Sequence, residues 1–416
     1  MSVPHSRTVV VDALRTPFVK SFGFFENEPG LNLSARLASE ILNRNHVKAS
    51  LVDQVIWGTV ISVLPHHNIA RDIVIFSGLP PTIPAHTVSK ACISALEAVQ
   101  SATDAINSGR SHIILTGGVE VMSRTPLTFS EPARKFFVKL NRLRTMGEKL
   151  ALFRLEFKLS MLFPTAPALA ESATGFTMGD HAEIMSVKNN ITREAQDAYT
   201  FQSHKRAAAA IAAGHMGNEI VPFSARVEKN SVACVDADNL IRPDVTMDDL
   251  KKLKPVFDRK SGTLTAGNST ALTDGASAVL LASAEAAAQH NLPVLGRIVH
   301  SVTVGVNPND QLLIGPAYAI PELLKQVGLK TSDIDVYEIH EAFAAQLLSC
   351  TNKLDIPMER INIDGGSLAY GHPLAASGGR LIARGLRIAK RLGVKRVVVS
   401  ACAAGGLAQA ILLETI

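Results

Sequence analysis

The chain carries an internal duplication, which restricts it to folds built from two similar halves. The segment 109–116 (GRSHIILT) reappears as 393–400 (GVKRVVVS), an offset of 284 residues. Three further pairs match in the same order: 7–11 with 296–300, 53–58 with 335–340, and 278–281 with 410–413. Four matches in one order argue against chance similarity among valine-rich strands. Each half alternates strand and helix patterns, which predicts an α/β fold with mixed sheets layered between helices.

The halves differ in the interval between their last two matched strands. A few residues separate Cys402 from the final strand, whereas the interval 118–274 of the first half is far longer. An insertion between two strands is the simplest account, and a chain of 416 residues is long enough for several domains. We therefore place the first half at 1–124 plus 252–285, an inserted loop domain at 125–251, and the second half at 286–416.

Composition and cysteine usage limit the class of protein. The residues are 47% hydrophobic and 5% aromatic, which favours aliphatic sheets covered by helices. The four cysteines form neither a C-x-x-C pattern nor a disulfide framework, so we expect a reducing compartment and no metal site. No signal or transit pattern precedes the first expected strand at 8–11, and no apolar stretch would span a bilayer. We expect the bacterial cytoplasm, with the mitochondrial matrix as the alternative.

Two cysteines and two histidines stand in short settings rich in small residues: Cys92 in KACIS, His340 in HEAF, His372 in YGHP and Cys402 in SACAAGG. Small neighbours suit a buried active site, because backbone N–H groups can approach a reacting carbonyl. Cys92 opens an apolar segment that Ser108-Gly109 closes, so we predict its thiol at a helix N-terminus, whose dipole favours the thiolate. A packed core cysteine is the alternative.

The segment around His372 pairs with that around Cys92 through the repeat. By the offset of 284 residues it leads into a helix facing the helix of Cys92, and the small residues 376–379 would let the two approach closely. A histidine there can act as base for the thiol, although histidines in glycine-rich turns are often structural. Cys402 follows a buried strand, and backbone N–H groups of 403–406 could form an oxyanion pocket. The alternative interpretation is that Cys402 is only a small residue that fits a tight turn.

These motifs, the duplication and the insertion resemble the thiolases, a family of acyl-CoA C-acyltransferases, over essentially the whole chain. Further matches are 117–123 (GGVEVMS), 178–179, 265–268 (TAGN) and 274–276. The likeness is greatest to the trifunctional-protein β subunit and its bacterial counterparts, which share ACIS, HEAF and CAAGG. It implies duplicated βαβαβαββ halves in a five-layered α-β-α-β-α arrangement.

The resemblance also implies a mechanism. Cys92, activated by His372, would attack the 3-keto carbon of a 3-ketoacyl-CoA and keep the acyl group as a thioester. Cys402 would protonate the departing acetyl-CoA enolate and then deprotonate the incoming CoA. The enolate oxygen would meet His372 and a water held by His340, and the backbone N–H groups of Cys92 and Ala404 would serve the acyl-enzyme carbonyl.

CoA is then a co-substrate, and no bound cofactor is expected. Positions that match the family's CoA contacts are Met178, Arg242, Phe257, Ala266, Thr270, Ala342 and Phe343. Arg242 suits the anionic nucleotide end, although it could be a solvated surface charge. Two departures from the family, Ala375 and Ala408 in place of glycine, each add a methyl group where backbone packs closely.

The net charge of +5 is concentrated in the segment 131–163, which holds eight Lys or Arg and three Glu. Such a local patch is no nucleic-acid footprint, so no nucleic-acid partner is expected. Phe136, Leu140 and Leu143 recur at helical spacing among the basic residues, which predicts an amphipathic cationic surface. It could contact an anionic membrane or a hydratase/3-hydroxyacyl-CoA dehydrogenase subunit; the alternative is a cover over the acyl tunnel. A homodimer or tetramer is also expected.

The leading hypothesis is a degradative 3-ketoacyl-CoA thiolase, which performs the last step of fatty-acid β-oxidation on medium to long chains. A biosynthetic acetoacetyl-CoA thiolase is an alternative, because the chemistry is reversible. A condensing synthase would leave Cys402 without a role. A non-catalytic subunit that binds acyl-CoA is the remaining alternative, and the intact set of Cys92, His372 and Cys402 argues against it.

Overall fold

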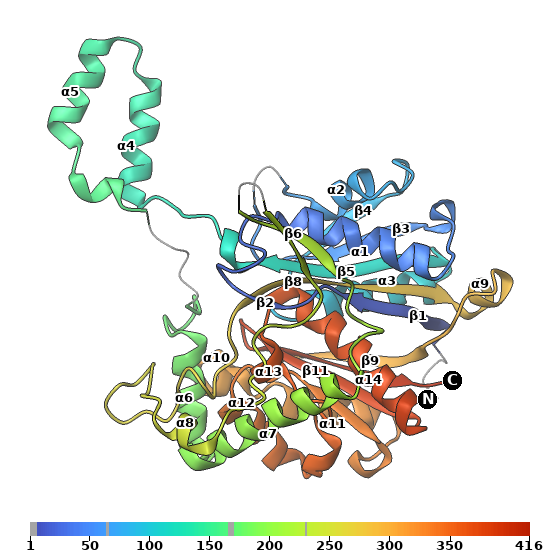
Figure 1. Ribbon diagram of the computed structural model, residues 1–416. Coiled ribbons are helices and arrows are strands. Elements are labelled where there is room, and N and C mark those ends of the chain that lie inside the picture. The colour runs from blue at the N-terminus through green and yellow to red at the C-terminus, as the bar shows by residue number, and fades with distance from the viewer. Residues whose placement is uncertain (1–5, 64–65, 165–169, 229–230) are drawn as a thin grey trace. The chain divides into compact units, whose positions relative to one another are not determined.

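The computed structural model describes residues 6–63, 66–164, 170–228 and 231–416. The chain divides into two compact units. The main unit runs to Ser123 and resumes at Ala170–Ile416, and the small unit is Arg124–Leu169 (Figure 1). The three-part division expected from the duplication stays a prediction. It is drawn from the repeated sequence segments, whereas these two units are defined by how compactly the residues pack. None of the helices in the described ranges is long and apolar enough to cross a membrane.

The main unit is built on a ten-stranded sheet of order β10-β11-β12-β9-β1-β8-β5-β3-β4, with β2 beside β8. The strands of this sheet are β1 Thr8–Arg15, β2 Val19–Lys20, β3 Gln54–Gly58, β4 Ala85–Val88, β5 Ile113–Val121, β8 Thr273–Ser283, β9 Gly296–Gly305, β10 Val336–Ile339, β11 Arg396–Ala403 and β12 Leu407–Glu414. A separate two-stranded sheet pairs β6 Phe223–Glu228 with β7 Ser231–Val235.

The sheet repeats one pattern of strand order and direction. In the first half β3 and β5 are parallel, and β5-β8-β1 continue antiparallel. In the second half β10 and β11 are parallel, and β11-β12-β9 continue antiparallel. The halves meet where β1 pairs with β9. The predicted duplication is therefore confirmed in the topology of the sheet.

Helices complete five layers, as the resemblance to the thiolases implies. α3 Ser94–Asn107 and α14 Ser377–Leu392 pack on each other between the two halves of the sheet. α1 Gly30–Arg44 and α2 Ile69–Phe76 cover the other face of the first half, and α11 Pro316–Val327 covers that of the second. The other helices of the main unit are α6 Met178–Lys188, α7 Arg193–Ala212, α8 Met247–Lys251, α9 Ala284–Gln289, α10 Pro308–Gln311, α12 Ala344–Leu354 and α13 Ser367–Tyr370.

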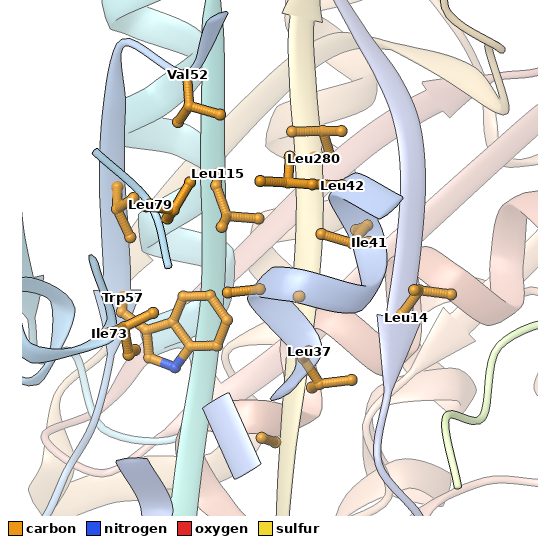
Figure 2. Packing of buried hydrophobic residues seen from close by; sticks show 14 of the residues in the cluster. Leu14, Leu37, Ile41, Leu42, Val52, Trp57, Ile73, Leu79, Leu115 and Leu280 are labelled. Carbon is orange, nitrogen blue, oxygen red and sulfur yellow. The ribbon is translucent and has the colours of Figure 1, made fainter. Parts of the chain in front are cut away.

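Alternation along the strands decides which side chains face which helices. Trp57 and Leu115 belong to the core beneath α1, whereas their neighbours Ile56 and Ile114 belong to the core around α3 and α14. Figure 2 shows the first of these cores, where Leu37 and Ile41 of α1 lie over the strands. The sheet is thus apolar on both faces, as its near-continuous hydrophobic strands require.

The two central helices approach closely because Gly378 has no side chain. A Cβ there would lie 2.7 Å from Leu96 Cγ and 2.9 Å from Leu96 N of α3. This confirms the predicted role of the small residues that open the second helix. The close approach brings the N-terminal ends of α3 and α14 together.

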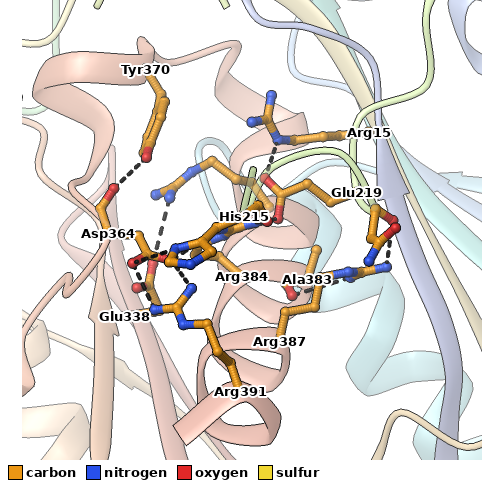
Figure 3. Close-up of polar contacts among 12 residues, drawn as sticks. Arg15, His215, Glu219, Glu338, Asp364, Tyr370, Ala383, Arg384, Arg387 and Arg391 are labelled. Atoms are coloured by element: carbon orange, nitrogen blue, oxygen red, sulfur yellow. Dashed lines mark hydrogen bonds and ion pairs between the residues drawn. The ribbon is translucent and has the colours of Figure 1, made fainter. Parts of the chain in front are cut away.

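Buried charges connect distant parts of the main unit (Figure 3). The carboxylate of Glu219 accepts hydrogen bonds from Arg15 Nε at 2.9 Å and from Arg384 Nε, also at 2.9 Å. Arg15 also forms a bidentate pair with Asp238, at 2.6 and 2.7 Å. Arg384 donates to Asp364 at 3.0 Å. The network therefore links β1, the segment before β6, and α14.

The small unit consists of α4 Glu131–Arg142, α5 Met146–Glu156 and a short turn after them. Phe136 is buried with Ala133 and Met161, and Leu140 packs against this cluster, as the predicted amphipathic spacing requires. Thr145 and Glu148 form a reciprocal capping box at the start of α5. Large apolar side chains stay exposed beside the basic residues, among them Leu150, Leu155, Leu159 and Phe163.

Candidate active site

Cys92 lies in a tight turn between β4 and α3. Ala91, directly before it, has a left-handed backbone with φ of 47°. Ser94 holds this turn, because its hydroxyl accepts from Lys90 N at 2.8 Å and donates to the Ala91 carbonyl at 2.6 Å. A non-glycine residue in this conformation costs energy that the surrounding contacts must offset. The strained turn projects the thiol just ahead of the helix.

The thiol of Cys92 is neutral at rest. Burial raises its pKa to about 11, and the charge of Glu120 adds to this effect. The backbone N–H groups of Ala404 and of Cys92 itself stabilise the thiolate and act in the opposite direction. The sequence predicts that the helix dipole favours the thiolate, and at this buried position desolvation is the larger effect and acts against it. The same N–H groups are the two expected oxyanion donors, and both lie at the sulfur.

The rings of His340 and His372 lie against each other, with centroids 4.1 Å apart and planes tilted by 41°. Nδ1 of His372 is 2.6 Å from Ser377 Oγ, and Nδ1 of His340 is 2.8 Å from Ser367 Oγ. Both Nε2 atoms are buried and have no hydrogen-bond partner within the described residues. Each imidazole is thus held through one nitrogen and leaves the other available to a ligand.

Both imidazoles are neutral. Burial and the nearby charge of Arg380 lower the pKa of His372 to about 3. Burial, His372 and Arg380 hold the pKa of His340 well below its usual value. Arg380 itself donates to Ser367 Oγ at 3.3 Å and pairs with Glu338 at 3.5 Å. A neutral His372 can accept a proton, as a general base must.

Cys402 lies near the end of β11, and its thiol is buried. Burial raises its pKa well above the usual value, and the charge of Cys92 adds to this, which places the two thiols within electrostatic reach. The chain then turns through Gly405 and Gly406, with φ of 83° and 71°. The strand end and this turn hold a protonated thiol, and the backbone N–H of Ala404 lies beside Cys92.

Most of the residues expected to contact CoA lie together. The rings of Phe257 and Phe343 meet edge to face at 5.9 Å, and Thr270 N donates to the Ala342 carbonyl at 3.0 Å. Met178 opens α6, where a Cβ on the following glycine would lie 2.0 Å from the Phe257 ring. Ala266 lies in the loop 265–268, whose Asn268 carbonyl accepts from Ala344 N.

Arg242 lies elsewhere, in a different polar setting. Its backbone N donates to His204 Nδ1 at 3.3 Å. A cavity of about 400 Å³ is lined by Arg242, Pro243, Asp244, Val245 and Asp249. Arg242 is exposed, and it lines this cavity together with two acidic residues, Asp244 and Asp249.

Of the two departures from the family pattern, Ala408 is accommodated by a glycine. It faces Gly315, where an added Cβ would lie 2.4 Å from the Ala408 methyl. Ala375 is fully buried, and its backbone carbonyl packs against Gly118, where a Cβ would be 2.4 Å away. Both alanines are therefore closely packed in the main unit.

Sequence reasoning missed several groups that hold the site. Glu120 accepts from Val60 N at 3.0 Å and Ile61 N at 3.1 Å, and burial raises its pKa to about 7. Glu341 is buried and accepts from Ser203 Oγ at 2.9 Å and Asn362 Nδ2 at 2.7 Å. Both stand inside quoted motifs, GGVEVMS and HEAF, and a buried-acid reading of those motifs would have found them.

A duplicated α/β fold whose halves meet at paired cysteines and histidines defines a class, the thiol-dependent acyltransferases. Within it, the chain belongs to the thiolase family: the model of the thiolase N-terminal domain matches residues 8–285, and that of the C-terminal domain matches 292–415. The expected family and fold class are thereby confirmed.

Named relatives cover the whole chain. The 3-ketoacyl-CoA thiolases of Pseudoalteromonas translucida and Yersinia pestis are each 37% identical over 98% of this chain and 97% of their own. The solved acetyl-CoA acetyltransferase of Bacillus anthracis superposes with a TM-score of 0.90 at 32% identity, over 99% of both chains. Human mitochondrial 3-ketoacyl-CoA thiolase in complex with CoA gives 0.87 at 32% identity, over 100% of both.

Proposed function

We propose that this chain is a 3-ketoacyl-CoA thiolase, which cleaves 3-ketoacyl-CoA with CoA into acetyl-CoA and a chain-shortened acyl-CoA. The observations that carry this proposal are the paired rings of His340 and His372, the electrostatic interaction between Cys92 and Cys402, and the close approach of α3 and α14. Full-length relatives with this name support it.

Acyl transfer to Cys92 begins with two neutral partners. The pKa values of about 11 for Cys92 and about 3 for His372 make a preformed ion pair strongly unfavourable. Nε2 of His372 therefore takes the thiol proton as the sulfur attacks the 3-keto carbon, which is general-base catalysis. The N–H groups of Cys92 and Ala404 stabilise the developing oxyanion. Collapse of the adduct breaks the Cα–Cβ bond and leaves acyl-Cys92 and an enolate.

Cys402 supplies the proton that the enolate needs. Its raised pKa keeps it as a thiol until the carbanion forms, which suits a general acid. The resulting thiolate removes the proton of the incoming CoA thiol, and the CoA sulfur displaces Cys92 from the acyl group. Cys92 recovers its proton from His372. His340, with a water, would hold the enolate oxygen through its unpartnered Nε2.

CoA would lie along Met178, Phe257, Phe343, Thr270 and Ala342. Its pantetheine arm would pass the aromatic pair. Ala266 would line the same path, and Arg242, beside its cavity, would meet the anionic nucleotide end. A relative solved with CoA bound supports CoA as the ligand.

The test is CoA-dependent thiolysis of 3-ketoacyl-CoA esters from about four to sixteen carbons. Each CH₂ group of the acyl chain that is buried adds about 0.8 kcal/mol of binding free energy. Activity that rises with chain length and is lost in Cys92→Ala, but kept in the exposed-cysteine control Cys234→Ala, is expected. Activity on the four-carbon ester alone would favour an acetoacetyl-CoA thiolase. The similarity to the acetyl-CoA acetyltransferase of Bacillus anthracis is the reason to test this alternative. CoA binding without turnover would favour a non-catalytic subunit.

The small unit is proposed as a docking surface for an anionic membrane. Exposed apolar side chains such as Leu155 and Phe163 stand among its basic residues. The triple variant R142E/R144E/K149E should stop co-sedimentation with phosphatidylserine vesicles, whereas K48E/K325E/K390E, with the same charge change on the main unit, should not. Equal pelleting of both variants would instead favour docking of a partner subunit.

A homodimer is proposed through β4. This strand is the open edge of the sheet, and its side chains are mostly half-exposed. An unpaired edge strand invites pairing with a second copy. Light scattering of the purified chain measures the assembly, and a monomer at micromolar concentration would contradict it. Location in the bacterial cytoplasm stays a prediction.

A further inference from the structure

A closed turn precedes α6 and connects two parts of the site. Ala170 bridges to Thr177, and Glu171 N donates to the Phe176 carbonyl at 2.8 Å. Gly175 N donates a hydrogen bond to the Glu171 carbonyl at 2.8 Å. Thr177 then caps α6. The backbone of Glu171 is thus fixed from both sides, and its side chain has a defined direction.

The carboxylate of Glu171 reaches the loop that follows Cys402. Its Oε2 accepts the Gly405 N–H at 2.7 Å, and the residue is only 8% exposed. A bond from an N–H group to a carboxylate is shorter and stronger than a neutral one. Gly405 and Gly406 both have left-handed backbones in the short turn between β11 and β12, which the pairing of Ala403 with Leu407 closes. The Gly406 carbonyl of this turn accepts from Val306 N at 2.7 Å. The contact with Glu171 is a further support, and it acts on the residue next to Ala404.

The position of this contact matters for the neighbouring amide. Gly405 directly follows Ala404, whose N–H lies at the sulfur of Cys92. We propose that Glu171 is a positioning residue for acyl transfer: by holding the Gly405 N–H, it keeps the Ala404 N–H directed at the oxyanion formed on Cys92. The inference rests on the proposed thiolase function and adds to it a group that never touches the substrate.

The same turn also reaches the proposed CoA site. Thr174 Oγ1 lies 2.8 Å from His181 Nε2 of α6, and the Phe176 ring packs edge to face on that histidine at 5.9 Å. Met178 opens the same helix. One turn therefore ties the N-terminus of α6 to the oxyanion loop. Loss of the Glu171 contact leaves α6 capped by Thr177, so catalysis should suffer more than CoA binding.

The experiment compares Glu171→Ala, Glu171→Gln and the exposed control Glu194→Ala in the full chain. Removal of an oxyanion donor costs about 100- to 1,000-fold in kcat, so misdirection of one should cost about 10- to 100-fold. We expect that loss in Glu171→Ala, with KM for CoA within about twofold. Glu171→Gln keeps an acceptor oxygen and should recover most of the activity.

Alkylation of Cys92 by iodoacetamide supplies a readout that a disrupted fold would change. This reaction forms no oxyanion, but it uses the thiolate, which the Ala404 N–H also stabilises. Its rate at fixed pH should therefore fall much less than kcat in Glu171→Ala. Unchanged kcat in Glu171→Ala, equal losses in the Ala and Gln variants, or an alkylation rate that falls as far as kcat would overturn the positioning role. A wild type that neither cleaves 3-ketoacyl-CoA nor forms acyl-Cys92 would overturn the proposed function instead.

Discussion

Replacing Glu219 by glutamine should destabilise the fold strongly without touching the reactive residues. Arg15 donates to one carboxylate oxygen and Arg384 to the other, and all three side chains are buried. Glutamine offers one oxygen and one NH₂ group, so one arginine would meet a donor in place of an acceptor. The variant also removes the negative charge that Arg15 and Arg384 share.

Two routes give the size of the effect. Burial alone would raise the pKa of Glu219, but Arg384, Arg15 and Arg387 outweigh it and lower the pKa from 4.5 to about 2. At 1.36 kcal/mol per pKa unit, this shift corresponds to about 3 kcal/mol of stability. Removing one partner of a buried ion pair typically costs about 3–5 kcal/mol. We therefore expect Glu219→Gln to lose about 3 kcal/mol of unfolding free energy at pH 7.

The pH dependence has a defined sign. A carboxylate with a lowered folded-state pKa stabilises the fold above its unfolded pKa, and this contribution disappears as pH falls through the folded pKa. The difference between wild type and variant should stay constant from neutral pH down to 4.5 and shrink between 4.5 and about 2.

Guanidinium unfolding at fixed protein concentration measures this difference at each pH. Glu285→Gln is the matched control, because its ion pair with Arg7 is exposed, and its unfolding midpoint should not move. A loss below about 1 kcal/mol at pH 7, the range of surface pairs, would refute the reasoning, as would a difference that grows on acidification.

Three further predictions concern the site and its supports. Glu120→Gln removes a charge that raises the pKa of Cys92, so the pH profile of iodoacetamide alkylation should shift to lower pH; a shift to higher pH would contradict this. Because the pKa of His372 is lowered to about 3, it stays neutral at any higher pH, and kcat/KM should lack the acid limb near 6.5 of an ordinary histidine. Gly378→Ala would place a Cβ 2.7 Å from Leu96 and should cost about 1–3 kcal/mol in urea unfolding. Gly147→Ala, which meets open space, should cost nothing.

The features predictable from the sequence are those that repeat or that follow local rules. The duplication predicted two halves that repeat one pattern of strands and helices, and the apolar run after Cys92 predicted the helix that ends before Gly109. The small residues that open α14 predicted its close contact with α3.

The features that were missed depend on contacts between distant residues. Ser367 and Ser377, which orient the two imidazoles, are ordinary serines in the sequence. The sign of the pKa shift of Cys92 depends on its burial and on Glu120, neither of which a helix-dipole argument contains. Glu171 lies far along the chain from Gly405, so no spacing rule connects them.

The repeated topology of the sheet has a further consequence: equivalent positions in the two halves carry residues with different roles. The strand end that carries His340 in the second half carries Gly58 in the first, where a Cβ would lie 2.7 Å from that of Ser94. The helix start that carries Cys92 in the first half carries Ala376 in the second. The pseudo-twofold arrangement therefore contains one reaction centre rather than two. The halves are complementary, because Cys92 belongs to the first and His372 to the second, so neither fragment alone would contain both this nucleophile and its base.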